Sequence, residues 1–155
     1  MNDTDGFFMK EALAQAREAR AHGEVPVGAV LVMDGKVIAK AHNKKECAHD
    51  PTGHAELIAL KSGAQMLGSW RLNNATLYVT KEPCVMCAGA MVNARLGRLV
   101  YGCRDEKGGA VESLYALLSD KRLNHQVEVI SGVLKKECAD VLKKFFREKR
   151  NREFV

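Results

Sequence analysis

The residues from Val27 to Met33 are almost all apolar, and this run constrains the fold more than any other feature of the sequence. A strand that is apolar on both faces must be covered on both sides, which is typical of the sheets in α/β proteins. Asp34-Gly35 then predicts a tight hairpin turn, and residues 36–41 return as a second strand. The chain therefore needs helices on both faces of a sheet.

Strand-like and helix-like segments alternate along the rest of the chain, and Asp5 is a candidate cap for the first helix. The predicted helices span 6–21, 54–67, 83–95, 113–118 and from about 135 onward. Further strands are predicted over 75–80, 99–103 and 127–130. This order predicts an α/β protein, a three-layer α/β/α sandwich with a central five-stranded mixed sheet.

Size and composition predict a single domain over residues 1–155. The chain has 155 residues, of which 46% are hydrophobic, which is enough for one core. No apolar run approaches the roughly 18 residues of a membrane helix. The first five residues are polar rather than signal-like. We therefore expect a cytoplasmic protein that does not bind membranes.

The net charge is +5, and most of the excess lies near the C-terminus. Residues 135–155 hold eight basic and four acidic side chains, a net +4. Such clustering is typical of a surface for RNA or polyphosphate, although a solvated helix face has the same composition. The candidate phosphate contacts are Lys143, Lys144, Arg147, Arg150 and Arg152.

Two short motifs, His54-Ala55-Glu56 and Pro83-Cys84-Val85-Met86-Cys87, indicate a metal site. Each lies at the start of a predicted helix, where the partial positive charge lowers the pKa of a thiol. Cys84 and Cys87 are three residues apart, so they share one helix face. One histidine and two cysteines suit zinc, and three protein ligands leave the fourth position for water.

A catalytic zinc with an adjacent carboxylate predicts a hydrolase. Zinc lowers the pKa of water from about 15.7 toward 7, and the hydroxide would attack an electron-poor ring carbon. Glu56 would move the protons. Two alternatives remain, namely a redox-active Cys-x-x-Cys pair and a structural zinc with His49 or Cys103 as its fourth ligand.

Longer stretches around these motifs resemble the bacterial tRNA-specific adenosine deaminases, which belong to the cytidine-deaminase-like zinc enzymes. The matching stretches are 25–30, Asn43, 49–56, 82–91, 101–107 and 145–147. The resemblance implies a cytidine-deaminase-like fold and conversion of adenosine to inosine at the wobble position of a tRNA anticodon. It also implies one Zn²⁺ per subunit and a homodimer that binds the anticodon stem-loop.

The resemblance also implies roles for individual residues. It makes His54, Cys84 and Cys87 the zinc ligands and Glu56 the proton shuttle. Substrate contacts are implied for Asn43 with the target nucleotide, Val27 with the base, Asp105 with the anticodon backbone, and Phe145 and Arg147 in the tail. Cys103 departs from the family pattern, since a small residue is common there.

Two rival functions share the same zinc site. One is a deaminase of a free base or nucleotide such as guanine or cytidine, which would not need a basic tail. The other is a zinc-stabilised RNA-binding module without catalysis, which would not need Glu56.

Overall fold

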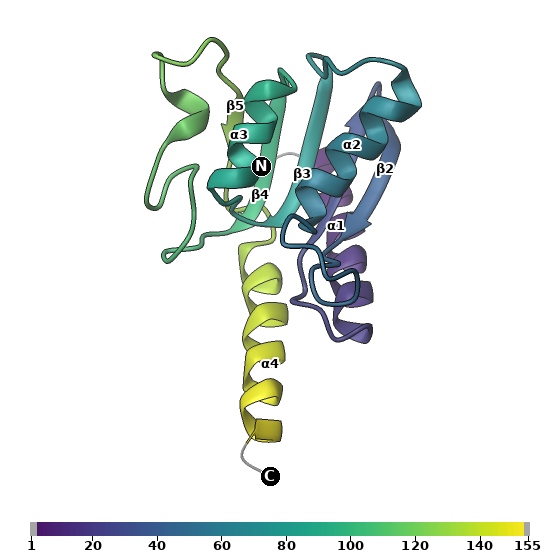
Figure 1. Cartoon of the computed structure of the whole chain (residues 1–155), viewed down its shortest axis with the longest axis vertical. Helices are drawn as coiled ribbons and strands as arrows, with labels where there is room; N and C mark the ends of the chain where they lie inside the picture. Colours follow the sequence, from purple (N-terminus) through teal and green to yellow (C-terminus); the bar gives the residue numbers. More distant parts are fainter. Residues whose placement is uncertain (1–2, 154–155) are drawn as a thin grey trace.

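A mixed sheet of five strands forms the centre of the protein, in the order β2-β1-β3-β4-β5 (Figure 1). The structure is a computed structural model that describes residues 3–153, so the first two and last two residues of the predicted domain lie outside the described residues. The pairings of β1 with β2 and β3 are antiparallel, and those of β4 with β3 and β5 are parallel. The strands are β1 (Gly28–Met33), β2 (Lys36–His42), β3 (Ala75–Lys81), β4 (Arg98–Cys103) and β5 (Glu128–Ile130).

Helices cover both faces of this sheet, as the apolar run in β1 requires. On β1, Leu31 packs in the core beneath α2 and α3, whereas Val30 packs in the core on the side of α1 and α4. The predicted three-layer sandwich is therefore confirmed. The helices are α1 (Asp3–Ala21), α2 (Ala55–Leu67), α3 (Val85–Asn93), the 3-10 turn η1 (Leu117–Ser119) and α4 (Lys135–Glu153). None of the helices within residues 3–153 is long and apolar enough to cross a membrane.

The first helix begins at Asp3, three residues before the predicted start, and Asp5 is not its cap. The Asp5 carboxylate is buried, with 2% of the residue exposed. It accepts hydrogen bonds from the Tyr78 hydroxyl at 2.8 Å and from both terminal nitrogens of Arg98 at 2.9 and 2.7 Å. A tertiary ion pair with β4 thus replaces the local capping role that the sequence suggested.

The predicted helix over 113–118 is wrong, because only the short turn Leu117–Ser119 is helical in this region. Leu114 and Tyr115 are more than half exposed, so the segment has no continuous apolar face against the core. The preceding backbone is held by hydrogen bonds to the Glu82 carboxylate. Tertiary contacts therefore fix this stretch as an irregular loop.

One edge of the sheet brings together segments that are distant in the sequence. Gly28 at the start of β1 pairs with His42 at the end of β2, and Lys81 at the end of β3 pairs with Cys103 at the end of β4. The chain leaves this edge toward α2, α3 and the loop after β4. Ligand sites in α/β proteins form at such an edge, beyond the carboxyl ends of the strands.

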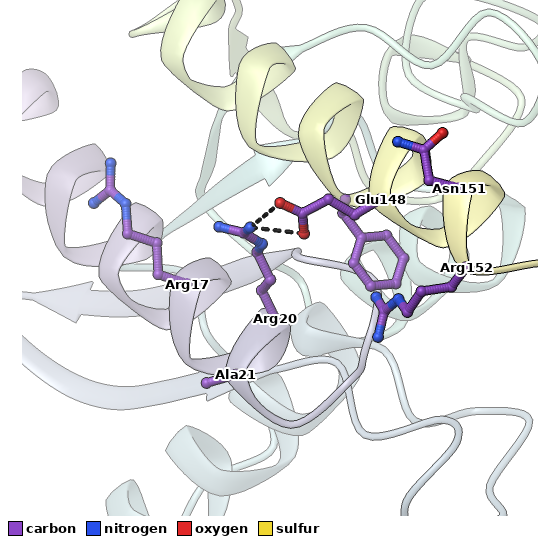
Figure 2. A pocket seen from close by; sticks show the side chains of 7 residues that line it. Arg17, Arg20, Ala21, Glu148, Asn151 and Arg152 are labelled. Atoms are coloured by element: carbon purple, nitrogen blue, oxygen red, sulfur yellow. Dashed lines mark hydrogen bonds and ion pairs between the residues drawn. The ribbon is translucent and has the colours of Figure 1, made fainter. Parts of the chain in front are cut away.

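The last helix, α4, begins beside the end of β4 and extends well beyond the sheet (Figure 1). Its outer part lies beside the end of α1, where Arg20 forms an ion pair with Glu148 at 2.7 Å (Figure 2). Phe145 is buried at this contact, with 4% exposed. The other side of α4 borders the sheet edge described above, where Lys81 and Asp105 lie.

Candidate metal centre and substrate cavity

The side chains of His54, Cys84 and Cys87 meet at the N-terminal ends of α2 and α3. Their ligand atoms all lie within 4.8 Å of one another. The Nδ1 atom of His54 is 3.5 Å from each of the two sulfurs. Within residues 3–153 this is the only group of three His, Cys, Asp or Glu side chains close enough to share an ion. The structure thus brings together the three residues that the sequence nominated as metal ligands.

The local backbone explains why these side chains converge. The sequence placed His54 inside α2, but both His54 and Cys84 are N-cap residues with extended backbone dihedrals. Neither side chain caps its own helix. Each is therefore directed past the helix end, while Cys87 joins them from the first turn of α3.

The electrostatics of the two sulfurs are those of a site made for a cation. Cys87 donates a hydrogen bond to the Cys84 sulfur, which, together with His54, lowers the pKa of Cys84 to about 3. The same bond and burial raise the pKa of Cys87. A divalent cation bound between the two sulfurs would stabilise both thiolates. A nitrogen and two sulfurs are a donor set that fits zinc.

The two residues considered as a fourth structural ligand, His49 and Cys103, are not part of the cluster. Cys103 is buried, and its thiol donates to the Thr80 carbonyl at 3.5 Å. Burial also raises the pKa of the Cys103 thiol, so this side chain is a weak nucleophile and a weak ligand. A metal ion held by these three side chains alone would keep one coordination position open, which is typical of catalytic rather than structural sites.

Glu56 lies in the first turn of α2 with 4% of its surface exposed, and it borders the same site. Desolvation by burial raises the pKa of its carboxyl group. A carboxyl group whose pKa lies nearer neutrality is better suited to accept and return a proton. Its position and environment match those of a general acid–base group.

A cavity of about 160 Å³ opens beside the metal ligands. Its walls bring together six of the nine residues that the sequence nominated, namely Val27, Asn43, His54, Glu56, Cys84 and Asp105. Cys87 is buried and hydrogen-bonded to Cys84. Sequence reasoning missed four further lining residues, which are Val25, Lys45, Lys81 and Glu82. Of these four residues, only Lys81 and Glu82 had a signal in the sequence. They directly follow the predicted strand 75–80, which places them at this edge of the sheet.

Asn43 has a structural contact as well as a place in the cavity. Its side-chain oxygen accepts a hydrogen bond from the backbone N–H of Ala55 at 2.9 Å, and this N–H belongs to the first residue of α2. Asn43 therefore helps to hold the helix that carries Glu56. With the oxygen engaged in this way, the amide nitrogen is the atom suited to donate to a ligand.

A larger groove adjoins the cavity and shares Lys81 and Asp105 with it. These two side chains form an ion pair at 3.2 Å. The groove has a volume of about 770 Å³. It runs between the loop after β4 and α4, and its walls are Lys81, Asp105, Lys107, Gly108, Leu142, Lys143, Phe146, Arg147 and Arg150.

The tail residues predicted as substrate contacts are divided between two surfaces. Arg147 lies in the groove, whereas Phe145 is buried on a neighbouring face of α4, in a pocket with Arg20 and Glu148. Phe146, which the sequence did not nominate by itself, is 39% exposed and lines the groove. The two rings contact each other edge to face, with their centroids 5.3 Å apart. Because consecutive side chains of a helix point in different directions, only Phe146 reaches the groove.

A family model of the MafB19-like deaminases matches residues 2–150 of the chain. A tRNA-specific adenosine deaminase of Bacillus subtilis (strain 168) is 50% identical over 149 residues, which cover 96% of this chain and 92% of that protein. The chain belongs to the tRNA-specific adenosine deaminase family.

Solved structures support the fold of this deaminase. A structure from a study of A-to-I editing by tRNA:A34 deaminases at the wobble position of transfer RNA matches with a TM-score of 0.85 and 47% identity, covering 88% of this chain and 99% of that one. A guanine deaminase from Bacillus subtilis matches with a TM-score of 0.62 and 38% identity, covering 67% of this chain and 66% of that one. The cytidine-deaminase-like fold is therefore confirmed for this deaminase.

Proposed function

We propose that this deaminase converts adenosine to inosine at the wobble position of a tRNA anticodon. The observation that carries the proposal is that a small cavity beside a His-Cys-Cys cluster adjoins a basic groove, with Lys81 and Asp105 lining both. The named relatives act on tRNA adenosine, and this geometry suits a single base that belongs to a larger polyanion.

His54, Cys84 and Cys87 would hold one zinc ion. When bound, the ion would supply Lewis-acid activation of a water molecule. Glu56 takes a proton from the water while the water oxygen bonds to C6 of the adenine, and it delivers that proton to N1. Glu56 then moves the proton of the new hydroxyl group to the amino group, so that the C–N bond breaks, ammonia leaves and the carbonyl group of inosine forms. The burial of Glu56 suits this role, because a carboxylate that is shielded from solvent is a stronger base than a solvated one.

The cavity selects one base and orients it. Its volume of about 160 Å³ is below the roughly 300 Å³ at which pockets for drug-sized ligands begin, so it suits a single ring system. Val27 provides an apolar wall, and the Asn43 amide nitrogen donates to the nucleotide. The adenosine must leave its stack to enter, which costs least in a single-stranded loop such as an anticodon.

The groove binds the nucleotides that flank the reacting adenosine. Five of its side chains are cations, Lys81, Lys107, Lys143, Arg147 and Arg150, and they would contact phosphates near the flipped base. Asp105 lies at the junction, where it would contact the anticodon backbone next to the reacting nucleotide. Phe146 is better placed than the buried Phe145 to stack on a neighbouring base, because its ring is partly exposed in the groove.

The proposed partner besides tRNA is a second copy of the chain. A largely apolar depression of about 630 Å³ lies on the outer side of α2 and α3, where Val85 is 52% exposed next to the ligand Cys84. Leu57, Met86 and Leu123 also line it. A homodimer would cover these side chains and would bring its second subunit beside the substrate cavity. We place the enzyme in the cytoplasm, where its tRNA substrate is found.

The decisive test is inosine formation in bulk tRNA treated with the wild-type protein and with Glu56→Ala. The proposal expects inosine at the wobble position with the wild type alone, while the zinc content of the variant stays at one ion per chain. Adenosine that stays unchanged in every candidate anticodon would overturn it.

The rival functions have their own readouts in the same experiment. Free guanine or cytidine consumed faster than tRNA adenosine would favour a deaminase of free bases, as in the guanine deaminase relative. Tight RNA binding with no deamination of any substrate would favour an RNA-binding module.

A further inference from the structure

Glu82 is a buried carboxylate that the proposed chemistry does not use. It directly follows β3 and precedes Pro83-Cys84, and only 2% of the residue is exposed. One carboxylate oxygen accepts hydrogen bonds from the backbone N–H of Asp105 at 3.0 Å and from the Ser113 hydroxyl. The other accepts from the backbone N–H groups of Val111, Glu112 and Ser113 at 3.1, 2.8 and 2.9 Å.

All five donors are neutral groups within residues 105–113. A buried carboxylate is costly unless its oxygens are fully hydrogen-bonded, and here the loop supplies every one of these bonds. The loop in turn needs the carboxylate, because three successive N–H groups converge on one oxygen. Loop and carboxylate therefore stabilise each other, and movement of either one leaves buried polar groups without partners.

The backbone confirms how closely the loop is fitted to this carboxylate. A β-carbon at Gly109 would lie 2.3 to 2.4 Å from the Glu82 carboxylate atoms, so no side chain fits there without displacement. The Ala110 N–H also donates to the Pro83 carbonyl at 2.9 Å, and the Glu82 N–H donates to the Cys103 carbonyl at 2.8 Å. The loop after β4 is thus attached to the segment that carries the ligand Cys84.

This same loop presents side chains to the substrate groove. Asp105, Lys107 and Gly108 line the groove, and Asp105 stands with Lys81 where the groove meets the cavity. The Asp105 side chain accepts hydrogen bonds from the N–H groups of Lys107 and Gly108 at 3.1 and 3.2 Å. The shape of the groove wall therefore depends on how the 105–113 backbone is held.

We propose that Glu82 is a positioning residue for RNA: its carboxylate holds the 105–113 loop against the metal-ligand segment, so that Asp105 and Lys107 meet the nucleotides beside the flipped adenosine. This inference rests on the proposed function. Glu82 acts through the loop and not on the reacting base, so its loss weakens recognition of the RNA more than it slows the chemical step.

The principal test is Glu82→Gln in the full-length, zinc-loaded enzyme, assayed on an anticodon stem-loop RNA. The glutamine amide turns an NH₂ group toward N–H donors, so several of the five bonds are broken. We expect KM to rise by about tenfold or more, which corresponds to the loss of one charge-assisted contact between the displaced loop and the RNA. We expect kcat to change little and zinc content not at all. Glu106→Gln, an exposed acid on the same loop, is the matched control.

Gly109→Ala disturbs the contact between the loop and the Glu82 carboxylate from the side of the loop, and it keeps the carboxylate itself. We expect the same rise in KM, and a double variant with Glu82→Gln that is no worse than the more impaired single variant, because both changes break one contact. Amide hydrogen exchange at Val111, Glu112 and Ser113 should accelerate in both variants, which reports the loop directly.

Two outcomes would overturn the inference. The first is a lowered melting temperature with an unchanged KM in both variants, since Glu82 would then support the fold alone. The second is a fall in kcat together with loss of zinc, since Glu82 would then serve the metal ligands rather than the RNA-facing loop. A failure of the proposed function is distinguishable, because it would appear in the wild-type protein as absence of inosine.

Discussion

Arg20 on α1 holds Glu148 on α4 through one guanidinium nitrogen, which lies 2.7 and 2.8 Å from the two carboxylate oxygens (Figure 2). The pair joins the outer part of α4 to the body of the protein, on the side opposite the basic groove. Arg147 and Arg150 project into that groove from the same helix. The pair therefore contributes to the placement of the side of α4 that lines the groove.

Reversing one charge of this pair should loosen the outer part of α4. We expect Arg20→Glu to accelerate amide exchange in residues 145–152 and to weaken RNA binding, with little change in melting temperature, because exposed ion pairs add little to global stability. The swapped protein, Arg20→Glu with Glu148→Arg, keeps the net charge of the wild type and should restore both properties. Equal RNA binding in the single and swapped variants would contradict this role of the pair.

The metal ligands give a prediction about metal removal. Treatment with a strong chelator should abolish deamination, and added zinc should restore it. Cys87→Ser should lose both zinc and activity, because the hydroxyl of serine is a poor zinc ligand compared with a thiolate. Metal analysis beside an inosine assay measures both. A chelated protein that still deaminates at the full rate would contradict the assignment.

The basic groove predicts a strong dependence of RNA affinity on salt. Replacing Arg147 or Arg150 by glutamine should weaken binding and reduce the slope of log K against log salt by about 0.7 for each phosphate of single-stranded RNA that the variant no longer neutralises. Lys36, which lies at the hairpin end of β1 and β2 away from the groove, is the matched control. A slope that is the same in the groove and control variants would argue against phosphate binding there.

The ion pair between Asp5 and Arg98 predicts how stability depends on pH. The hydrogen bonds from Arg98 hold the pKa of Asp5 below its ordinary value. The stabilisation is therefore complete above the unfolded-state pKa and is lost as pH falls through the lowered folded-state pKa. Asp5→Asn should reduce the free energy of unfolding by about 2 kcal/mol near neutrality, since Arg98 loses its charge-assisted hydrogen bonds and keeps only the longer contact with the exposed Glu128 at 3.8 Å.

Urea unfolding measured between neutral and acidic pH checks this prediction. The difference between wild type and variant should shrink below about pH 5 as Asp5 becomes protonated. A difference that stays constant down to the acid limit would mean that the charge of Asp5 is not what stabilises the contact.

The apolar depression on α2 and α3 predicts the oligomeric state. Leu123→Asp should shift the protein from dimer toward monomer in sedimentation velocity, because it places a charge in the covered surface. Met66→Asp, at an exposed position on the last turn of α2, should leave the dimer intact. A wild-type protein that sediments as a monomer at all concentrations would exclude the interface.

Much of this architecture follows from local sequence patterns. The apolar run at 27–33, the Asp34-Gly35 turn and the two candidate ligand motifs are each readable within about ten residues. The structure confirms the sheet and brings the three candidate ligands together. Asp5 and Glu82 were not understood from the sequence, because their partners lie 93 residues away at Arg98 and 23 to 31 residues away in the loop. Contacts over such separations leave no periodic signal in the chain.

The different environments of Phe145 and Phe146 have a similar explanation. The sequence shows that a helix carries two aromatic residues, but which of them is buried depends on the side of α4 that packs against α1. The buried position of Phe145 and the groove position of Phe146 become clear only once the helix is docked.

The Lys81–Asp105 ion pair divides the surface into a small cavity that contains the reacting groups and a broad groove with one wall made by a single protruding helix. These two parts can change separately during evolution or engineering. Substitutions along the groove side of α4 would alter which folded RNA is accepted without touching the chemistry. Substitutions at cavity positions that neither line the groove nor hold its loop, such as Val27, would alter the base without changing RNA binding. A scaffold divided in this way is suited to being redirected toward new nucleic acids.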